Sequence, residues 1–368
     1  MTHRWTVPAI LLPLVLAAAC LTTGNPPRPA PLGDGASRCP PTPFSRDWSR
    51  DPAIVEIPDP QAPLYAVGDV HGTLPELREL LVRAGLIRES EAGDFEWIGG
   101  KAVLVQTGDL INKGPHSLAA IEFAIALESK AAAQGGRAVF LAGNHEIGFL
   151  AKAPQKWYAP IADEARSRGL DVCADVHSAR TSFGQWLRTR PAAAVIGGIY
   201  FSHSGNSQGL TRAQIARFYR ELVDTGDFGS RRGCGDPGAG PPLPGFFNAD
   251  VWWGPAGSRL DGWLAALGVR QAAFGNDPEA FLAKGQLVGT FHSEAGRALF
   301  KLDVGTAYGD SRGALLRCTE FLPGGGCARP ERLVNPAKAG AGSAAFEPVP
   351  LSAQPPAQDQ PPPHAWGC

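Results

Sequence analysis

The chain has 368 residues, and its 34 basic and 35 acidic residues leave a net charge of −1. This balance excludes the strongly basic class of nucleic-acid binders and gives no reason to expect docking on an anionic membrane. Hydrophobic residues make up 44% of the chain, enough for a globular core, and the length fits one large domain or two ordinary ones.

The N-terminal segment, residues 1–20, has the features of an export signal. Arg4 supplies positive charge, and the apolar run at 7–19 is shorter than the roughly 20 residues of a transmembrane helix. The segment ends in Leu-Ala-Ala-Ala-Cys, which resembles a bacterial lipoprotein signal with Cys20 as the lipidated residue. We therefore expect an exported protein, periplasmic or associated with the outer membrane by a lipid anchor. Simple cleavage after Ala19, which leaves a soluble secreted protein, is the alternative.

Composition divides the rest of the chain into three parts. Residues 21–50 are rich in Pro, Gly and Arg, which predicts a flexible tether. Residues 51–328 form the expected folded domain. Residues 329–368 include a tract rich in Pro and Gln with little to pack, which predicts a disordered tail.

Six cysteines follow Cys20, and an even number in an exported chain favours disulfides. Six cysteines allow 15 pairings, so the connectivity is not fixed by the sequence. We expect Cys318 to pair with Cys327, because they are close in sequence, and Cys173 to pair with Cys234.

In the first half of the domain, three short apolar runs predict buried strands at residues 64–67, 102–106 and 138–142. Apolar residues at helical spacing follow the first run from Leu74, and a second helix is expected from Ser117, which can cap it. Parallel strands joined by such helices bring their carboxyl ends to one edge of a sheet, where ligands usually bind.

The second half of the domain alternates differently. A hairpin with a Gly-Gly turn is expected at residues 193–202, followed by a helix at 209–224 and a Gly- and Pro-rich loop at 226–248. Further strands are expected at 271–274, in a hairpin at 286–303, and at 313–317. Crossovers followed by hairpins predict an α/β fold in which two mixed β-sheets pack face to face, flanked by helices.

The loop after each of the first three strands carries a polar motif. They are Gly-Asp-Val-His-Gly from Gly68, Gly-Asp-x-x-x-Lys-Gly-Pro from Gly108, and Gly-Asn-His-Glu from Gly143, and His203 follows a later strand. In this order the motifs resemble the calcineurin-like metallophosphoesterases, in particular the branch of serine/threonine phosphoprotein phosphatases and symmetrical diadenosine tetraphosphatases. The resemblance covers about residues 63–318.

The resemblance implies an enzyme with two divalent metal ions, of Mn, Fe or Zn. It would hydrolyse phosphate monoesters, on a phosphorylated protein or a small phosphoester, through metal-activated hydroxide. Mixed oxygen and nitrogen ligands suit these metals. The implied ligands are Asp69 and His71 for the first ion, Asp109 for both ions, and Asn144 and His203 for the second ion.

Three more residues receive roles from the same resemblance. His145 resembles the general acid that protonates the leaving oxygen. Asn112 stands where the phosphoprotein phosphatases have an Asp that orients this His, and an amide can accept a hydrogen bond but brings no charge. Lys113 replaces a phosphate-binding Arg with a point charge. Outside the motifs, we expect His116 to be a solvated residue at a helix start, with a place at the substrate mouth as the alternative. We expect His177 to lie on the surface.

The main departure from the family pattern is Asn276, which stands where the remaining imidazole ligand of the second metal ion is expected. An amide oxygen is a weaker ligand for these metals. Either Asn276 binds weakly, or Asp277 or His292 takes over, or the second ion is loosely held; for His292 we favour an exposed strand residue. A binding or scaffold protein with weakened catalysis on the same fold is therefore the alternative function.

Overall fold

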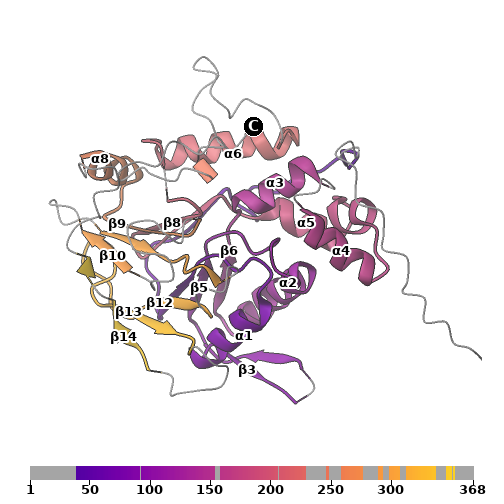
Figure 1. Cartoon of the computed structure of the whole chain (residues 1–368). Coiled ribbons are helices and arrows are strands. Elements are labelled where there is room, and N and C mark those ends of the chain that lie inside the picture. Colours follow the sequence, from indigo (N-terminus) through magenta and orange to yellow (C-terminus); the bar gives the residue numbers. More distant parts are fainter. Residues whose placement is uncertain are drawn as a thin grey trace, which may run out of the picture.

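The computed structural model describes residues 39–91, 93–153, 158–205, 207–228, 246–247, 258–276, 289–292, 298–306, 312–336, 345–349 and 351–352. Within these ranges, two large β-sheets pack against each other and helices cover their outer faces (Figure 1). The predicted sandwich of two mixed sheets is confirmed. The proposed export signal and most of the Gly- and Pro-rich loop expected at 226–248 lie outside the described residues.

One sheet has the strand order β14-β13-β12-β2-β5-β6. Its strands are β2 (Leu64–Val67), β5 (Val103–Gln106), β6 (Arg137–Phe140), β12 (Ala314–Cys318), β13 (Pro330–Val334) and β14 (Glu347–Pro348). The three strands with the motif loops are parallel neighbours, and Val67 aligns with Gln106, which aligns with Phe140. Their carboxyl ends therefore lie side by side, as the crossover pattern predicted.

The other sheet has the order β1-β7-β8-β9-β11-β10-β15. Its strands are β1 (Ile54–Ile57), β7 (Ala193–Ile196), β8 (Ile199–Ser202), β9 (Gln271–Phe274), β10 (Gly289–His292), β11 (Ala298–Lys301) and β15 (Leu351–Ser352). The expected hairpin at 193–202 is present, and both turn glycines, Gly197 and Gly198, have positive φ, as a two-residue hairpin turn requires. A separate two-stranded sheet, β3 (Ile87–Glu89) and β4 (Phe95–Trp97), was not predicted.

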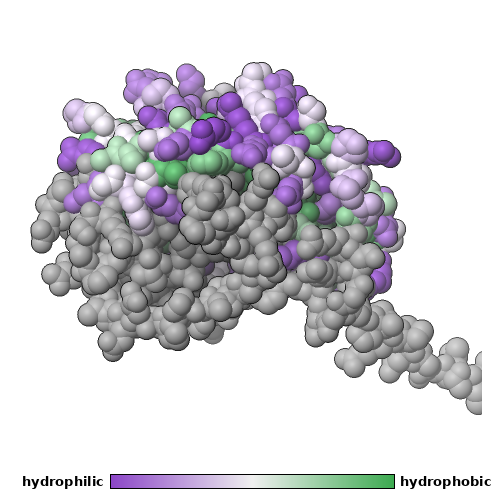
Figure 2. Space-filling view, turned by 90° about the horizontal axis from the view of Figure 1, so that it is seen from above, coloured by the Kyte–Doolittle hydropathy of each residue, from purple (hydrophilic) through white to green (hydrophobic). Residues whose placement is uncertain are grey.

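The described helices are α1 (Leu74–Arg83), α2 (Ser117–Ala133), α3 (Asn144–Lys152), α4 (Ala159–Ser167), the π-helix η2 (Val172–His177), α5 (Ser182–Thr189), α6 (Arg212–Thr225) and α8 (Ser258–Leu267). Helix α6 buries one stripe, Ile215, Tyr219 and Val223, against the sheet of β7 and β8. On the described part of the face seen from above, most side chains are hydrophilic and a smaller number are hydrophobic (Figure 2). In the described ranges no helix combines the length and apolarity needed to span a bilayer.

Strand alternation explains how each sheet is buried on both faces. In β2, Leu64 and Ala66 join the core between the two sheets, whereas Tyr65 and Val67 join the core under α1 and α2. Tyr200 of β8 faces the other way, into the core under α6 and α8. The four layers, helix, sheet, sheet and helix, thus follow from the period-two side-chain pattern of the strands.

The folded part extends beyond both predicted boundaries. At the N-terminal side, within the expected tether, the Arg46 side chain is buried and donates hydrogen bonds to the carbonyls of Arg188 and Arg190 at 3.1 and 2.9 Å. At the C-terminal side, β13 pairs with β12 and buries Leu333, so residues 330–334 of the expected disordered tail form a strand. The predicted range of the folded domain, residues 51–328, is therefore too short at both ends.

Two disulfides lie within the described residues. Cys318 bonds to Cys327, which confirms that prediction. The predicted pairing of Cys173 with Cys234 is wrong, because Cys173 of η2 bonds to Cys39 in the N-terminal segment. This bond was not predicted, because the N-terminal segment was expected to be a flexible tether. Cys234 lies outside the described residues.

Candidate metal centre

The predicted site residues come together where the strands of the two sheets end. Asp69, Asp109 and Asn144 follow β2, β5 and β6 of one sheet, and His203 and Asn276 follow β8 and β9 of the other. The Nδ1 of His203 lies 3.9 Å from Asp69, and its Nε2 lies 3.4 Å from Asp109 and 2.9 Å from the Oδ1 of Asn144. Two separate sheets therefore contribute to a single cluster.

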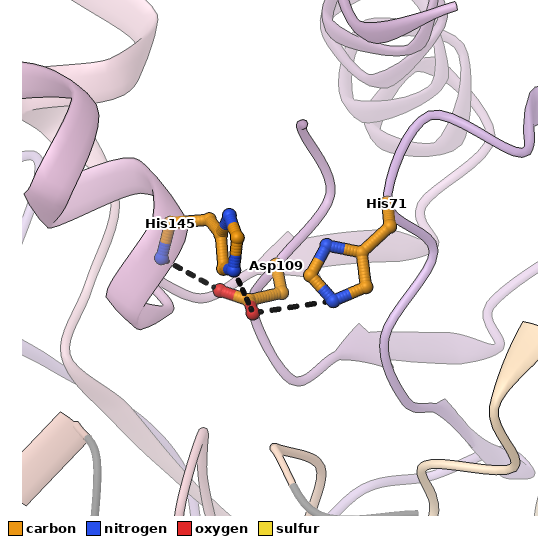
Figure 3. Close-up of side chains that lie close together, drawn as sticks. All are labelled: His71, Asp109 and His145. Atoms are coloured by element: carbon orange, nitrogen blue, oxygen red, sulfur yellow. Dashed lines mark hydrogen bonds and ion pairs between the residues drawn. The ribbon is translucent and has the colours of Figure 1, made fainter. Parts of the chain in front are cut away.

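The carboxylate of Asp109 is the centre of this cluster. Its Oδ2 lies 3.4 Å from the Nε2 of His71 and 3.7 Å from the Nε2 of His145, so it sits between two imidazoles (Figure 3). Its Oδ1 accepts a hydrogen bond from the backbone N–H of His145 at 2.9 Å. Asp109 is 2% exposed, which makes these charge interactions stronger than they would be in water.

Two compact groups of potential metal ligands share Asp109, with their ligand atoms all within 4.8 Å of one another in each group. One group holds His71 and His145, and the other holds Asp69 and His203. The shared carboxylate agrees with the bridging position expected for Asp109. Asp69 lies near both histidines: its Oδ2 is 3.6 Å from the Nε2 of His71 and its Oδ1 is 3.9 Å from the Nδ1 of His203, so the expected neighbours Asp69 and His71 do lie together. His145, expected as the general acid, also lies in one of the two groups.

The histidine hydrogen bonds leave lone pairs that suit a metal ion. The Nδ1 of His71 lies 3.1 Å from the carbonyl of Ile111, and the Nδ1 of His203 lies 3.0 Å from the carbonyl of Thr107. A carbonyl only accepts, so Nδ1 carries the proton and Nε2 keeps its lone pair, as in many metal-ligating histidines. The Nε2 of His203 then faces another acceptor, Oδ1 of Asn144, at 2.9 Å. A cation or a proton is needed between them, so the donor set fits a metal ion.

The charges of the cluster show the same need for a cation. Burial lowers the pKa of His203, but the charges of Asp109 and Asp69 outweigh it and raise this pKa to about 10. Burial and the neighbouring Asp303 raise the pKa of Asp69 well above its usual value. A divalent ion would satisfy both carboxylates and would compete with the proton on His203, as metal binding generally does.

The surroundings of His145 depart from the expectation in one respect. The Nδ2 of Asn112 lies 2.9 Å from the Nδ1 of His145, so the amide donates to the ring where it was expected to accept. The ring proton therefore lies on Nε2, which faces Asp109. Burial lowers the pKa of His145 to about 4, although the charge of Asp109 opposes this shift. His145 is thus neutral near pH 7.

Lys113, His116 and His177 were also singled out in the sequence, and they lie in three different environments. The ammonium of Lys113 donates from Nζ to the Nε2 of His71 at 2.7 Å, so it engages the lone pair that a metal ion on His71 would use. His116 is exposed at the N-cap of α2, as expected, whereas Ser117 lies inside the helix and its Oγ accepts from the N–H of Asn112. The expectation for His177 was wrong: it is 4% exposed and its Nε2 contacts the carbonyl of Leu150 at 3.0 Å.

Asn276 lies at the site, as its alignment with the missing imidazole suggested. Its backbone N–H donates to the Oδ1 of Asp69 at 3.0 Å. A Cβ on the preceding residue, Gly275, would lie 2.1 Å from the same oxygen, so only glycine fits there. Asp277 lies outside the described residues, and His292 ends strand β10.

Backbone strain gathers at this site. The non-glycine residues with positive φ include His71 at 49°, Asp109 at 57°, Asn112 at 71°, Lys113 at 61° and Asn276 at 66°. Each such residue costs about 1–3 kcal/mol and persists only where its surroundings hold it. The loops are therefore held in shapes that the local sequence does not favour, which is common at functional sites.

Two buried polar side chains at the site received no role from the sequence. Gln106, at the end of β5, donates from Nε2 to the carbonyl of Gly68 at 3.1 Å, and so joins the first two motif loops. Glu146, the last residue of the third motif, is fully buried and accepts hydrogen bonds from the backbone of the second motif loop. The presence of Glu146 within the motif was the only available signal for its importance.

Comparison with known proteins gives the site a context. The sequence profile of the calcineurin-like phosphoesterase family matches residues 62–271. Over 84 residues the chain is 39% identical to Shewanella-like protein phosphatase 2 of Arabidopsis thaliana, covering 23% of this chain and 20% of that protein. Over 159 residues it is 30% identical to the symmetrical bis(5'-nucleosyl)-tetraphosphatase of Aromatoleum aromaticum, covering 43% of this chain and 50% of that protein.

The chain therefore spans half or less of the length of these two relatives. Among solved structures, it resembles the cold-active protein-tyrosine phosphatase of a psychrophilic Shewanella species. The TM-score is 0.60 and the identity 21%, over 81% of this chain and 82% of that one. At this identity the likeness concerns the fold.

Proposed function

Because the chain belongs to the calcineurin-like phosphoesterase family, we propose that it is a metal-dependent phosphatase that hydrolyses phosphate monoesters. The observation that carries this proposal is the buried Asp109 carboxylate, which is shared by two groups of potential ligands. His145 lies beside this carboxylate, and Lys113 contacts His71 of the same cluster. The family uses two divalent metal ions, and a pair of sites that share one carboxylate is the arrangement such a pair needs.

The residues that would hold the two ions are Asp69, His71, Asp109, Asn144 and His203, with Asn276 as a weak further ligand. Their oxygen and nitrogen donors suit Mn, Fe or Zn. When bound, two such cations stabilise the negative charge that builds on the attacking and leaving oxygens of a phosphate ester.

The chain's own side chains would bind the substrate and move its proton. Lys113 contacts the Nε2 of His71 in this structure, and with that nitrogen holding a metal ion its ammonium would be available to contact a phosphate oxygen. His145 directs its Nε2 into the cluster and, once protonated, would give that proton to the leaving oxygen as the P–O bond breaks. Asn112 contacts the opposite ring nitrogen and so fixes the direction of the imidazole.

A cavity of about 650 Å³ adjoins Lys113 and offers space for the group esterified to the phosphate. Its walls are the loop that leads to α2, with Pro115 and His116, and one face of α4, with Pro160, Ser167 and Arg168 among others. The residues that line it include no Phe, Tyr or Trp within the described ranges, so it lacks the aromatic rings on which a nucleobase usually stacks. This composition supports a phosphoprotein or small phosphoester as substrate over a dinucleotide.

The proposal is tested by hydrolysis of p-nitrophenyl phosphate with added Mn²⁺, comparing the wild type with Asp109→Asn and His145→Ala. We expect both variants to lose most of the activity. Equal rates in all three proteins would reject the assignment. A panel that adds phosphopeptides and diadenosine tetraphosphate then identifies the substrate class, and turnover of the dinucleotide alone would reject the phosphate monoester.

Asn276 motivates one rival function, a binding or scaffold protein on the same fold with weakened catalysis. Without an imidazole ligand, the second metal ion would bind less tightly, and the catalysis that depends on it would be slower. Metal content separates the two functions. Nearly two ions per chain together with turnover favours the phosphatase, whereas one or none without turnover favours the rival.

We also propose that the protein is exported and that Cys20 anchors it to a membrane by a lipid. The two disulfides support an oxidising compartment, where such bonds form and persist. Fractionation of the producing bacterium, with Cys20→Ser as the comparison, tests both parts. We expect the wild type in the membrane fraction and the variant in the soluble periplasmic fraction. Wild type in the cytoplasm would reject export, and no difference between the two would reject lipidation.

A further inference from the structure

The carboxylate of Glu146 accepts hydrogen bonds from the backbone of two motif loops. It is completely buried. Its Oε2 accepts the backbone N–H groups of Asp109 and Gly143, each at 2.8 Å, and its Oε1 accepts the N–H of Ile111 at 3.2 Å. The side chain therefore joins the second motif loop to the third.

The contact with Asp109 matters because the backbone of this residue is strained. Its φ of 57° lies in the left-handed region, which costs a non-glycine residue about 1–3 kcal/mol unless its surroundings hold it. Glu146 holds the N–H of Asp109, and the backbone N–H of His145 holds its Oδ1 at 2.9 Å. Asp109 is thus fixed at both ends by helix α3, where Glu146 belongs to the first turn.

We propose that Glu146 is a positioning residue that sets the backbone of the shared carboxylate and so controls how tightly the metal pair is bound. This inference rests on the proposed metal centre. It goes further in assigning control of metal affinity to a residue that contributes no ligand atom. Residues that orient metal ligands in this way typically change metal affinity about 10–100-fold when they are replaced.

Glu164 provides a matched control. It also accepts two backbone N–H groups at the start of a helix, those of Leu118 and Ala119 at 2.8 and 3.1 Å, but neither belongs to a metal-ligand residue. Both carboxylates therefore bridge separate segments through backbone hydrogen bonds. They differ in whether the segment they hold carries Asp109. Glu164 is also less buried than Glu146, lies 3.8 Å from Arg168 and lines the cavity beside Lys113, so it serves as a control for metal affinity alone.

The test measures metal affinity directly, by titrating the metal-free full-length protein with Co²⁺ and following its visible absorption, and by calorimetry with Mn²⁺. We expect Glu146→Gln to weaken binding about 10–100-fold. Glu164→Gln should leave metal affinity unchanged, even if it lowers the melting temperature as much as Glu146→Gln does. In p-nitrophenyl phosphate hydrolysis, Glu146→Gln should lower kcat more than it changes KM, because phosphate contact by Lys113 remains.

Three results would overturn the proposal. Unchanged affinity in a folded Glu146→Gln protein would show that the contact does not set the metal centre. An equal loss of affinity in Glu164→Gln would show a general effect of instability. If Glu146→Gln does not fold, the test uses Glu146→Asp, which keeps the charge on a shorter side chain. This variant should bind the metal more weakly, and an affinity equal to that of the wild type would overturn the proposal. If the wild type itself bound no metal ion, that result would reject the proposed function and not only the role of Glu146.

Discussion

Replacing Asn112 by Asp should raise the pKa of His145 and change the pH dependence of catalysis. In the structure the amide of Asn112 donates to the Nδ1 of His145 at 2.9 Å, and that bond is lost when Nδ1 takes up a proton. Burial lowers the pKa of His145 to about 4, against the opposing charge of Asp109, and so keeps the imidazole neutral near pH 7. A carboxylate in the same place would accept the Nδ1 proton and would stabilise the imidazolium form that a general acid requires.

The size of the effect follows from the distance. Two unit charges 2.9 Å apart attract by about 6 kcal/mol at an effective dielectric constant of about 20, which is an upper bound before desolvation. A hydrogen bond to a charged group contributes about 1.5–3 kcal/mol net. At about 1.4 kcal/mol per pKa unit, the pKa of His145 should rise by roughly one to two units.

A general acid works in its protonated form, so the rate falls as the pH rises through its pKa. For Asn112→Asp the fall should therefore move to higher pH by roughly one to two units, and the rate near pH 7 should rise about 10–100-fold. The assay is the pH profile of kcat/KM for p-nitrophenyl phosphate with saturating Mn²⁺. Asn112→Leu, which removes the donor without adding charge, is the control. An unmoved profile in a folded, metal-loaded Asn112→Asp protein would refute this reasoning about His145.

The other predictions concern stability, metal affinity and substrate choice. Cys39 and Cys173 lie 134 residues apart, and on the loop-entropy model removal of their disulfide should lower the free energy of unfolding by about 5 kcal/mol. For Cys318 and Cys327, which are separated by 9 residues, the same model gives a loss of about 2.5 kcal/mol. Urea unfolding of the paired Cys→Ser variants measures both, and equal losses would contradict the model. Asn276→His should tighten binding of the second metal ion in calorimetry; unchanged stoichiometry and activity would mean that Asn276 has no part in the site. His116→Ala should raise KM for a phosphopeptide more than for p-nitrophenyl phosphate, and equal changes would argue against the cavity beside Lys113 as the substrate site.

The sequence predicted the parts of the fold that local patterns encode. Short apolar runs ending in Gly-Asp or Gly-Asn gave β2, β5 and β6, and the Gly-Gly turn gave the β7–β8 hairpin, because each pattern depends on neighbouring residues. The β3–β4 hairpin was missed, since its strands have three residues each and too little alternation to recognise.

The contacts that the sequence did not reveal are long-range ones. The buried Arg46 takes its partners from Arg188 and Arg190, more than 140 positions away, and Cys39 finds Cys173 at a similar distance in the chain. A composition rich in Pro and Arg suggested a loose tether, because nothing in it identifies a distant partner. Strand β13 was missed for the same reason, since its pairing depends on β12 being exposed at that edge.

The sequence predicted which residues form the site better than it predicted how their side chains are arranged. Motif order named Asp69, Asp109 and His203, and the structure brings them within ligand distance of one another. Which way the amide of Asn112 faces His145 depends on side-chain placement in three dimensions. The role of Glu146 depends on the left-handed backbone of Asp109, a conformation that sequence patterns do not report.

A crystal structure of the protein grown with Mn²⁺, with anomalous scattering recorded at the manganese edge, tests the central idea most directly. We expect two anomalous peaks, one on each side of the Asp109 carboxylate, with His203 and Asn144 beside one of them. No anomalous peak at Asp109, in crystals of protein that had been saturated with the metal, would contradict the proposed metal centre and the phosphatase built on it.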